Sequence, residues 1–450
     1  MSKPTDLRVL SCSTQTELIS YRSPIKFGGR VVTEAVLVNV NLAVETRSGK
    51  AGQGFGSMPM GNVWAWLTSL VSTENTLAAM LEFGRRLEKE IRGYQGIGHP
   101  LDITHDWEAG YQAIADGVVR DLKLAEPMPK LAQLVAASPF EAAIHDSLGK
   151  TLGVNSYNLL GPEYVNHDLA TYLEPAFAGE YLDRYTSREP KPKMPLYHLV
   201  GALDALTADD VAMRLEDGLP NTLGEWIIAD GLTHLKIKLA GDNLKWDLDR
   251  VVAVNAVAEE TQGMLGVETW FYSCDFNEKC PNVEYLLDFL KQLEERAPAA
   301  IRRLQYIEQP THRDLKAHPE NRMHRAAAIK PVVIDESLID LESFHLSREQ
   351  GYSGVALKAC KGHTEALLMG AAAQKYNMFL CVQDLSCPGY SFLHSASIAA
   401  RLPTIAAIEG NSRQYCPAGN VSWGKRFPSM FHITDGTVGT AALTGPGLGF

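Results

Sequence analysis

The sequence lacks the features that would tie it to a membrane or to nucleic acid. No apolar run approaches the ~20 residues that a helix needs to cross a bilayer, and residues 1–21 show neither the basic start nor the apolar stretch of a signal peptide. Basic residues are outnumbered, with 42 Lys and Arg against 53 Asp and Glu and a formal net charge of −11. Because nucleic acids bind basic surfaces, we expect no nucleic acid and no membrane as partner, and we expect a cytoplasmic protein.

Cysteine is scarce and irregularly spaced. The chain has seven cysteines, an odd number. Cys274 and Cys280, or Cys381 and Cys387, could be read as pairs of metal ligands, but each gap is wider than in a zinc knuckle and no His pair follows. We therefore expect buried, reduced thiols.

The first 165 residues indicate an α+β domain. Ala35–Glu45 alternates apolar and polar residues as a half-buried strand does, and helical patterns follow near Thr76–Arg92 and Leu131–Leu152. Glycines at positions 52, 54 and 56 lack the Gly-Lys-Ser/Thr ending of a phosphate-binding loop, so we expect a mobile loop there. With 450 residues in total, the chain is long enough for a second domain.

From Pro195 onward, short apolar runs alternate with amphipathic stretches, which is typical of repeated βα units. The runs predict eight strands, which are Leu196–Val200, Leu235–Leu239, Trp270–Phe276, Leu304–Ile307, Val332–Ile334, Val355–Leu357, Met378–Val382 and Ile405–Ile408. Eight such units within residues 195–424 favour an α/β fold, a closed (β/α)₈ (TIM-like) barrel. Residues 166–194 are the predicted connection, and residues 1–165, completed by about 425–450, the predicted cap. An open doubly wound sheet is the alternative.

Ionisable residues stand at the ends of seven consecutive predicted strands. They are Lys236 and Lys238, then Asp275, Glu308, Asp335 with Glu336, Lys358, Asp384 and Glu409. A single acidic residue after a strand is usually a helix N-cap, but seven successive strand ends are a less ordinary pattern. Since the carboxyl ends of barrel strands form one face, we expect these groups to converge at one mouth.

Three neighbouring strand ends predict a metal centre. The carboxylates of Asp275, Glu308 and Asp335 would repel one another unless a cation lay between them. Oxygen ligands in an open site suit Mg²⁺, which keeps positions for water or substrate. The sequence therefore predicts Mg²⁺ as cofactor. The net negative charge of the chain does not exclude an anionic substrate, because a metal or a lysine cluster can reverse the sign inside one pocket.

The lysines predict the chemistry. Lys236 and Lys238 share one face of their strand, and two neighbouring lysines should lower each other's pKa toward a neutral amine that can act as a base. Lys358, on the sixth strand, lies on the opposite side of an eight-stranded barrel. A small-molecule carboxylate on the metal would then hold its α-carbon between two amines. One amine would remove the α-proton while the metal stabilises an enediolate, and the other would return a proton to the opposite face.

At these residues the sequence resembles the enolase superfamily, and within it the muconate lactonizing enzyme-like group of the mandelate racemase/muconate lactonizing enzyme family. The resemblance rests on the Lys-x-Lys of the second strand, the three acids and the lysine of the sixth strand. Residues 144–161 also look like the end of that family's capping domain. The resemblance implies Asp275, Glu308 and Asp335 as metal ligands and Lys238 and Lys358 as opposing acid/base groups.

The resemblance also implies lesser roles. It makes Lys236 the companion of the second-strand base and Glu409 an acidic group near the substrate carboxylate. We also expect Asp384 to bind substrate. Lys361 has the other side-chain parity, which predicts a place behind the site or toward solvent. Residues 21–29 and 52–60 resemble the family's specificity loops.

Several reactions fit this expectation. Racemisation, epimerisation and cycloisomerisation all use two lysines on opposite faces. Acid-sugar dehydration is the alternative, although dehydratases of the superfamily more often place a His-Asp pair on strands seven and six. The loop at residues 383–387 lacks the paired acids of dipeptide epimerases. A non-catalytic binding protein on a retired barrel is the distant alternative, and we expect a homo-oligomer in either case.

Overall fold

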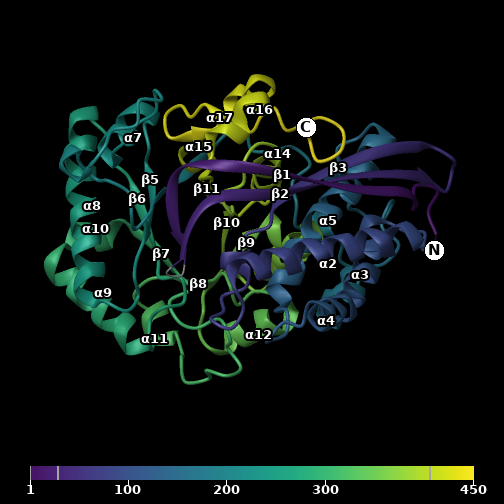
Figure 1. Cartoon of the computed structure of the whole chain (residues 1–450), viewed down its shortest axis with the longest axis horizontal. Coiled ribbons are helices and arrows are strands. Elements are labelled where there is room, and N and C mark those ends of the chain that lie inside the picture. The colour runs from purple at the N-terminus through teal and green to yellow at the C-terminus, as the bar shows by residue number, and fades with distance from the viewer. Residues whose placement is uncertain (1, 28–29, 405–406) are drawn as a thin grey trace.

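Long stretches of alternating side chains build the N-terminal sheet. The computed structural model, which describes residues 2–27, 30–404 and 407–450, places β1 (Leu7–Phe27), β2 (Arg30–Thr46) and β3 (Ala51–Pro59) in one antiparallel sheet of that order. The strand predicted at Ala35–Glu45 is confirmed as part of β2. Figure 1 shows β1 and β2 running from the N-terminal end of the molecule toward the barrel strands.

The glycine-rich segment is a strand, so the prediction of a mobile loop is wrong. Gly52, Gly54 and Gly56 lie on one face of β3, which packs against α5 (Lys130–Leu152). A Cβ added to Gly56 would lie 1.9 Å from the carbonyl oxygen of Pro139. Alternate residues of a strand share a face, so the three glycines together allow the helix to approach the strand backbone closely.

Replacing Gly56 with alanine should therefore lower the free energy of unfolding by about 3 kcal/mol, because the new methyl group overlaps backbone atoms that cannot move freely. Gly263 is the matched control, because a Cβ there meets nothing within 4 Å. It lies inside the helix α8 (Leu244–Leu265), where alanine should add up to about 1 kcal/mol of stability. Denaturant unfolding followed by circular dichroism measures both, and equal stability of the two variants would contradict the packing argument.

Eight parallel strands close into a barrel, which confirms the predicted fold and rules out the open sheet. They are β4 (Met194–Val200), β5 (His234–Lys238), β6 (Phe271–Asp275), β7 (Leu304–Glu308), β8 (Val332–Ile334), β9 (Gly354–Lys358), β10 (Phe379–Gln383) and β11 (Ile408–Glu409). Closure comes from parallel pairing of β11 with β4, in which Ile408 lies opposite Leu196. The eighth strand that the sequence predicts spans 405–408, of which residues 405 and 406 lie outside the described residues. A short strand, β12 (Thr437–Val438), pairs antiparallel with β4.

Helices cover the outside of the barrel and one face of the N-terminal sheet (Figure 1). In the N-terminal half they are α1 (Asn62–Ala65), α2 (Thr73–Gly93), α3 (Pro100–Ala109), α4 (Tyr111–Leu122), α5 and α6 (Leu169–Tyr172). In the barrel half they are α7 (Leu223–Asp230), α8, α9 (Val283–Arg296), α10 (Pro298–Arg303), α11 (His324–Ala327), α12 (Leu341–Glu349), α13 (His363–Lys375), α14 (Tyr390–Arg401), α15 (Ser412–Tyr415), α16 (Val421–Arg426) and α17 (Pro428–Phe431). No helix in the described part of the chain is long and apolar enough to cross a membrane.

The C-terminal residues return to the N-terminal helices. The backbone N–H of Leu448 donates to Asp146 Oδ1 on α5 over 3.1 Å, and that of Ser156 donates to the carbonyl oxygen of Gly447 over 2.7 Å. The ring of Phe450 packs against Tyr390 of α14 with centroids 4.8 Å apart. The two halves of the molecule are therefore tied together at this end, while the domain boundaries at 165, 194 and 424 stay predictions.

All seven cysteines are free and buried, as predicted. Burial raises the pKa of Cys12 and of Cys360 to about 12. Thiols in such surroundings are poor nucleophiles, because the reactive form is the thiolate. They contribute to packing rather than to the chemistry of the site.

Candidate active site

The interior of the barrel is layered. Its lower layer is apolar and consists of Tyr197, Tyr306, Val333, Ala356, Cys381 and Ala407. Residues two positions further along a strand point the same way. The next layer toward the carboxyl ends therefore consists of Leu199, Glu308, Asp335, Lys358, Gln383 and Glu409, all of which are buried.

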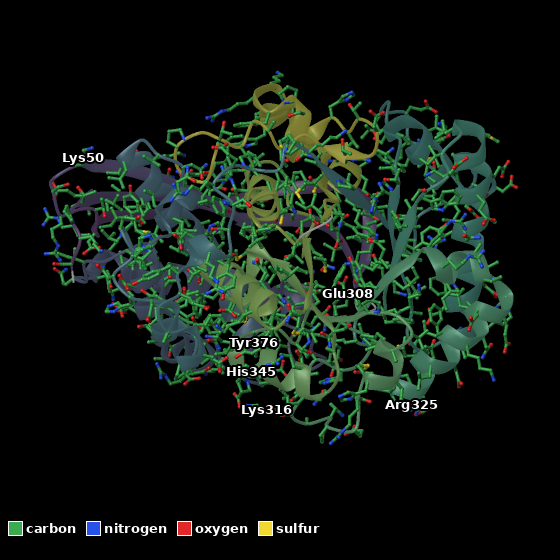
Figure 2. The ribbon with its side chains drawn as sticks, turned by 180° about the vertical axis from the view of Figure 1, so that it is seen from behind. Lys50, Glu308, Lys316, Arg325, His345 and Tyr376 are labelled. Carbon is green, nitrogen blue, oxygen red and sulfur yellow. The ribbon has the colours of Figure 1, made fainter. Side chains whose placement is uncertain are left out.

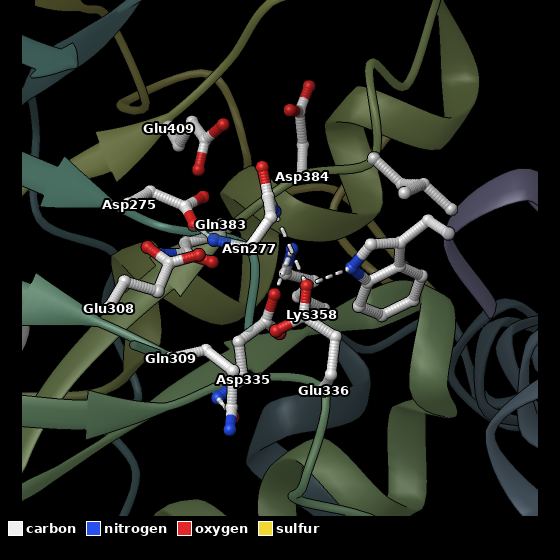
Figure 3. Close-up of polar contacts among 12 residues, drawn as sticks. Asp275, Asn277, Glu308, Gln309, Asp335, Glu336, Lys358, Gln383, Asp384 and Glu409 are labelled. Atoms are coloured by element: carbon white, nitrogen blue, oxygen red, sulfur yellow. Dashed lines mark hydrogen bonds and ion pairs between the residues drawn. The ribbon is translucent and has the colours of Figure 1, made fainter. Parts of the chain in front are cut away.

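Strand register places the charged groups at one height. Lys238 of β5 lies opposite Asp275 of β6, and Asp275 lies opposite Glu308 of β7. Figure 3 shows the carboxyl groups of Asp275 and Glu308 close together, with Glu409 nearby. Figure 2 shows Glu308 in the interior of the molecule, whereas Lys50 lies at its outer edge. The convergence predicted for these strand ends is thus present in the structure, except that Asp384 does not face the cluster.

Lys236 is the centre of a buried charge cluster. Its Nζ lies 2.8 Å from Glu308 Oε1 and 2.8 Å from Glu409 Oε2. The same nitrogen lies 3.1 Å from Asp275 Oδ2. Burial alone would lower the pKa of Lys236, but these three carboxylates outweigh it and raise that pKa well above its usual value. The expected lowering is therefore wrong for Lys236, because the carboxylates on neighbouring strands dominate over the second lysine.

Lys238 forms an ion pair with Asp275 and donates to Asn277 Oδ1 over 3.0 Å. Although burial opposes it, Lys238 and Lys236 hold the pKa of Asp275 below its usual range. A cavity of about 460 Å³ opens beside Lys238 and Asn277. Another cavity, of about 420 Å³, lies over β4 beside His198 and contains none of the charged groups of the barrel layer. Of these two cavities, the one beside Lys238 is therefore the one that borders the charge cluster.

Lys358 and Asp335 form the corresponding pair on the other side of the barrel. Lys358 Nζ lies 2.8 Å from Asp335 Oδ2, and Lys361 Nζ lies 3.2 Å from Asp335 Oδ1. Burial alone would raise the pKa of Asp335, but these two lysines outweigh it and hold that pKa below its usual value. Lys361 is buried and also donates to the carbonyl oxygen of Leu338 over 3.2 Å. Of the two expectations for Lys361, the place behind the site is the one observed.

Trp64 of α1 covers Lys358. Lys358 Nζ lies 4.6 Å from the centre of the Trp64 ring, and Trp64 Nε1 donates to Glu336 Oε1 over 2.9 Å. Burial, followed by the charge of Asp335, raises the pKa of Glu336 to about 7. Arg313 donates to the backbone carbonyl of Trp64 over 3.1 Å, so α1 is fastened to the barrel. No sequence pattern predicts this contact, since Trp64 is far from its partners along the chain.

On β10, the residue that faces the charge cluster is Gln383. Its side-chain amide donates to Glu308, whose pKa is raised well above its usual value by burial and by Asp275. Asp384 has the opposite parity and points away from Asp275 and Glu308 in Figure 3. Its carboxylate accepts hydrogen bonds from backbone N–H groups, of Ser386 at 3.2 Å, Cys387 at 3.1 Å and Asn411 at 3.2 Å. Asp384 therefore stabilises its own loop. Its binding of substrate stays a prediction.

The carboxylates of this site suit a hard cation as ligands, although lysines neutralise their charge in this structure. Among residues 2–27, 30–404 and 407–450, no three His, Cys, Asp or Glu side chains are gathered as a metal site. Asp275, Glu308 and Asp335 nevertheless supply only carboxylate oxygens, which suit Mg²⁺. The two carboxylate oxygens of Asp335 face the ammonium groups of Lys358 and Lys361. The Lys236 ammonium already lies between Asp275 and Glu308, where a cation is favourable. These residues could hold Mg²⁺, and their role as ligands stays a proposal.

The segments expected to be specificity loops are largely strands. Tyr21 belongs to β1, whereas Gly28 and Gly29 lie outside the described residues. Residues 52–59 belong to β3, and the chain that follows it reaches the barrel mouth, where a Cβ on Gly61 would lie 2.1 Å from Leu385 Cδ2. The N-terminal sheet therefore approaches the strand ends with ordered backbone.

One family model matches the chain. Residues 221–450, just over half of the chain, match a family described as enolase C-terminal domain-like. The match covers every strand from β5 to β11 and thus all of the charged residues at the ends of the barrel strands. No curated protein matches the sequence.

Solved structures share the fold at low identity. The L-Ala-D/L-Glu epimerase from Bacillus subtilis superposes with a TM-score of 0.62 at 17% identity, over 98% of each chain. A Bradyrhizobium enolase complexed with magnesium and mandelic acid gives 0.60 at 16% identity, over 99% of this chain and 96% of that one. The muconate lactonizing enzyme from Pseudomonas fluorescens gives 0.58 at 18% identity, over 98% and 96%. The superpositions support a common fold, a barrel with a capping domain. At such low identities they leave the reaction open.

Proposed function

Because the chain belongs to the enolase C-terminal domain-like family, we propose that it is an enzyme that removes the proton next to a substrate carboxylate. The reaction that we propose is racemisation or epimerisation, or the related cycloisomerisation, with Mg²⁺ as cofactor. The observation that carries the proposal is the placement of Lys238 on β5 and Lys358 on β9, four strands apart in a barrel of eight. Each of these lysines is paired with an acid expected to bind the metal.

The chain's own residues supply the proton transfers. A general base must lie within hydrogen-bond reach of its proton, and two amines on opposite sides of one α-carbon reach opposite faces. Lys236, held by three carboxylates, acts as a fixed positive charge rather than as a base. Asp275, Glu308 and Asp335 would hold Mg²⁺, which would neutralise charge that develops on the substrate carboxylate. Trp64 excludes water from Lys358 by covering its ammonium group.

The alternatives receive less support. An acid-sugar dehydratase with a His-Asp pair would need an ionisable side chain facing the site from the seventh strand, where this chain has Gln383. A side-chain amide has no pKa near neutral pH, so it does not act as a general acid or base. A non-catalytic binding protein would have no need for two buried lysines paired with acids on opposite sides of the barrel, because such pairs are costly to desolvate.

Solvent exchange tests the proposed function. Incubating the magnesium-loaded protein in D₂O with a library of small carboxylates should place deuterium at the α-carbon of at least one of them, measured by NMR. Abstraction of the proton alone is enough for this signal, so net turnover is not required. Chelation should abolish exchange and added Mg²⁺ should restore it. Undiminished exchange in exhaustively metal-free protein would refute the requirement for Mg²⁺. No exchange with any carboxylate would refute the abstraction of the α-proton.

A further inference from the structure

The cavity beside Lys238 carries a local positive charge. Three lysines line it, namely Lys26, Lys238 and Lys279, and Asp242 is the acid that lines it. The whole chain has a formal net charge of −11, so this pocket differs in sign from the molecule around it. A pocket lined mostly by one sign of charge raises the local concentration of the opposite ion.

Two of the lysines have no partner of their own. Lys238 is buried and paired with Asp275. Lys26 is exposed on β1 and Lys279 is half-buried in the loop after β6. Within the described part of the chain, neither the Lys26 nor the Lys279 ammonium makes a hydrogen bond or an ion pair. Both are available to a ligand that enters from the mouth.

The loop that carries Lys279 is held in a defined position. Asn277 and Glu278 have φ values of +44° and +61°, a left-handed conformation that asparagine tolerates and that is unfavourable for glutamate. The backbone N–H of Glu278 donates to the carbonyl oxygen of Gln309 over 2.7 Å, and that of Cys280 donates to Pro310 over 2.9 Å. Strain of this kind persists where the surroundings enforce it, often at ligand sites.

We propose that the substrate carries a second anionic group, which Lys26 and Lys279 bind while the reacting carboxylate lies at the charge cluster of Asp275 and Glu308. This inference rests on the proposed function for the reacting end and adds the chemical class of the other end. The cavity of about 460 Å³ is large enough for a small ligand. Trp246 also lines it, which provides an apolar wall for the carbon chain between the two anions.

Binding of matched ligands to the magnesium-loaded protein tests this inference. Titration calorimetry compares straight-chain dicarboxylates of four to seven carbons with monocarboxylates of the same carbon number. The best dicarboxylate should bind about tenfold more tightly, as a charge-assisted hydrogen bond allows. Lys26→Gln and Lys279→Gln should each reduce this preference, and the double variant should remove it. Both side chains are unpaired, so neither change should unfold the protein.

Two further variants serve as controls. Lys245 is exposed on α8, pairs with Asp249 at 2.6 Å and is not a lining residue, so Lys245→Gln should leave the preference unchanged. Asp242→Asn should increase it, because a like charge is removed from the wall. 3-Phosphonopropionate, compared with succinate, shows whether a carboxylate or a phosphate-like group is preferred. Equal affinity for mono- and dicarboxylates, or an equal effect of Lys245→Gln, would overturn the proposal.

Deuterium exchange measured on the same ligands separates the two claims. Exchange without a preference for dianions would support the proposed chemistry and refute the second anionic group. A preference for dianions without exchange from any ligand would support the anion-binding cavity and refute the chemistry. The cavity and the reaction are therefore judged by different readouts.

Discussion

Replacing Lys358 with alanine should abolish net inversion at the α-carbon, with a loss of at least about 1,000-fold, within the range that a positioned acid or base contributes. Exchange of the α-proton with solvent should survive for the one enantiomer that Lys238 addresses. The Lys238→Ala variant should show the mirror pattern. The reason is positional, because one amine cannot reach both faces of a substrate held in place. Optical rotation and deuterium incorporation, followed for each enantiomer separately, measure the two effects.

A conservative variant separates chemistry from lost structure. Lys358 is paired with Asp335 at 2.8 Å, so its removal leaves a buried carboxylate with one counter-ion fewer. Lys358→Arg keeps the positive charge, yet a guanidinium does not lose its proton in proteins and cannot act as a base. It should fold like the wild type and remain defective in inversion. If any of these variants interconverts both enantiomers at the wild-type rate, the two-base model is wrong.

Asp275→Asn should weaken Mg²⁺ binding by about 100-fold or more, because even residues that only orient metal ligands contribute 10–100-fold. Glu308→Gln should act in the same direction. A bound ion stabilises the folded state according to its affinity, so Mg²⁺ should raise the melting temperature of the wild type and not of these variants. Calorimetric titration with Mg²⁺ gives the affinities directly.

Asp384→Asn is the matched control for the metal site. Asp384 lies at the same mouth, but its carboxylate accepts backbone hydrogen bonds from its own loop and from Asn411. Its substitution should change the Mg²⁺ affinity little. A loss as large as that of Asp275→Asn would mean that the ligand set has been assigned to the wrong residues.

Much of the barrel could be predicted from sequence because its signals are local. Short apolar runs separated by amphipathic stretches mark the strands, and the polar residue at each end marks the mouth. Side-chain parity correctly grouped Lys236 with Lys238. The same rule, counted from the buried Cys381, selects Gln383 rather than Asp384 as the inward residue of β10. A search for ionisable residues alone misses Gln383, because its side chain is neutral.

The remaining errors come from distances that sequence does not contain. The pKa of Lys236 depends on acids from three other strands. Its neighbour Lys238 alone would lower that pKa, whereas the acids raise it. The contact of Trp64 with Glu336 joins the cap to the barrel and follows no periodic pattern. The glycines of β3 favour a mobile loop when the sequence is considered alone, whereas in the structure they let α5 approach the strand closely.

The burial of every cysteine makes the surface of this protein chemically quiet toward thiol reagents. A maleimide dye should label the folded protein only slowly, since buried thiols with raised pKa values are inert. One cysteine introduced at an exposed position would then carry the dye alone. Leu203 is 52% exposed and lines the cavity beside Lys238. Position 203 also borders the cavity beside His198. A fluorophore attached there would therefore report the filling of either cavity in real time, without removal of any native cysteine.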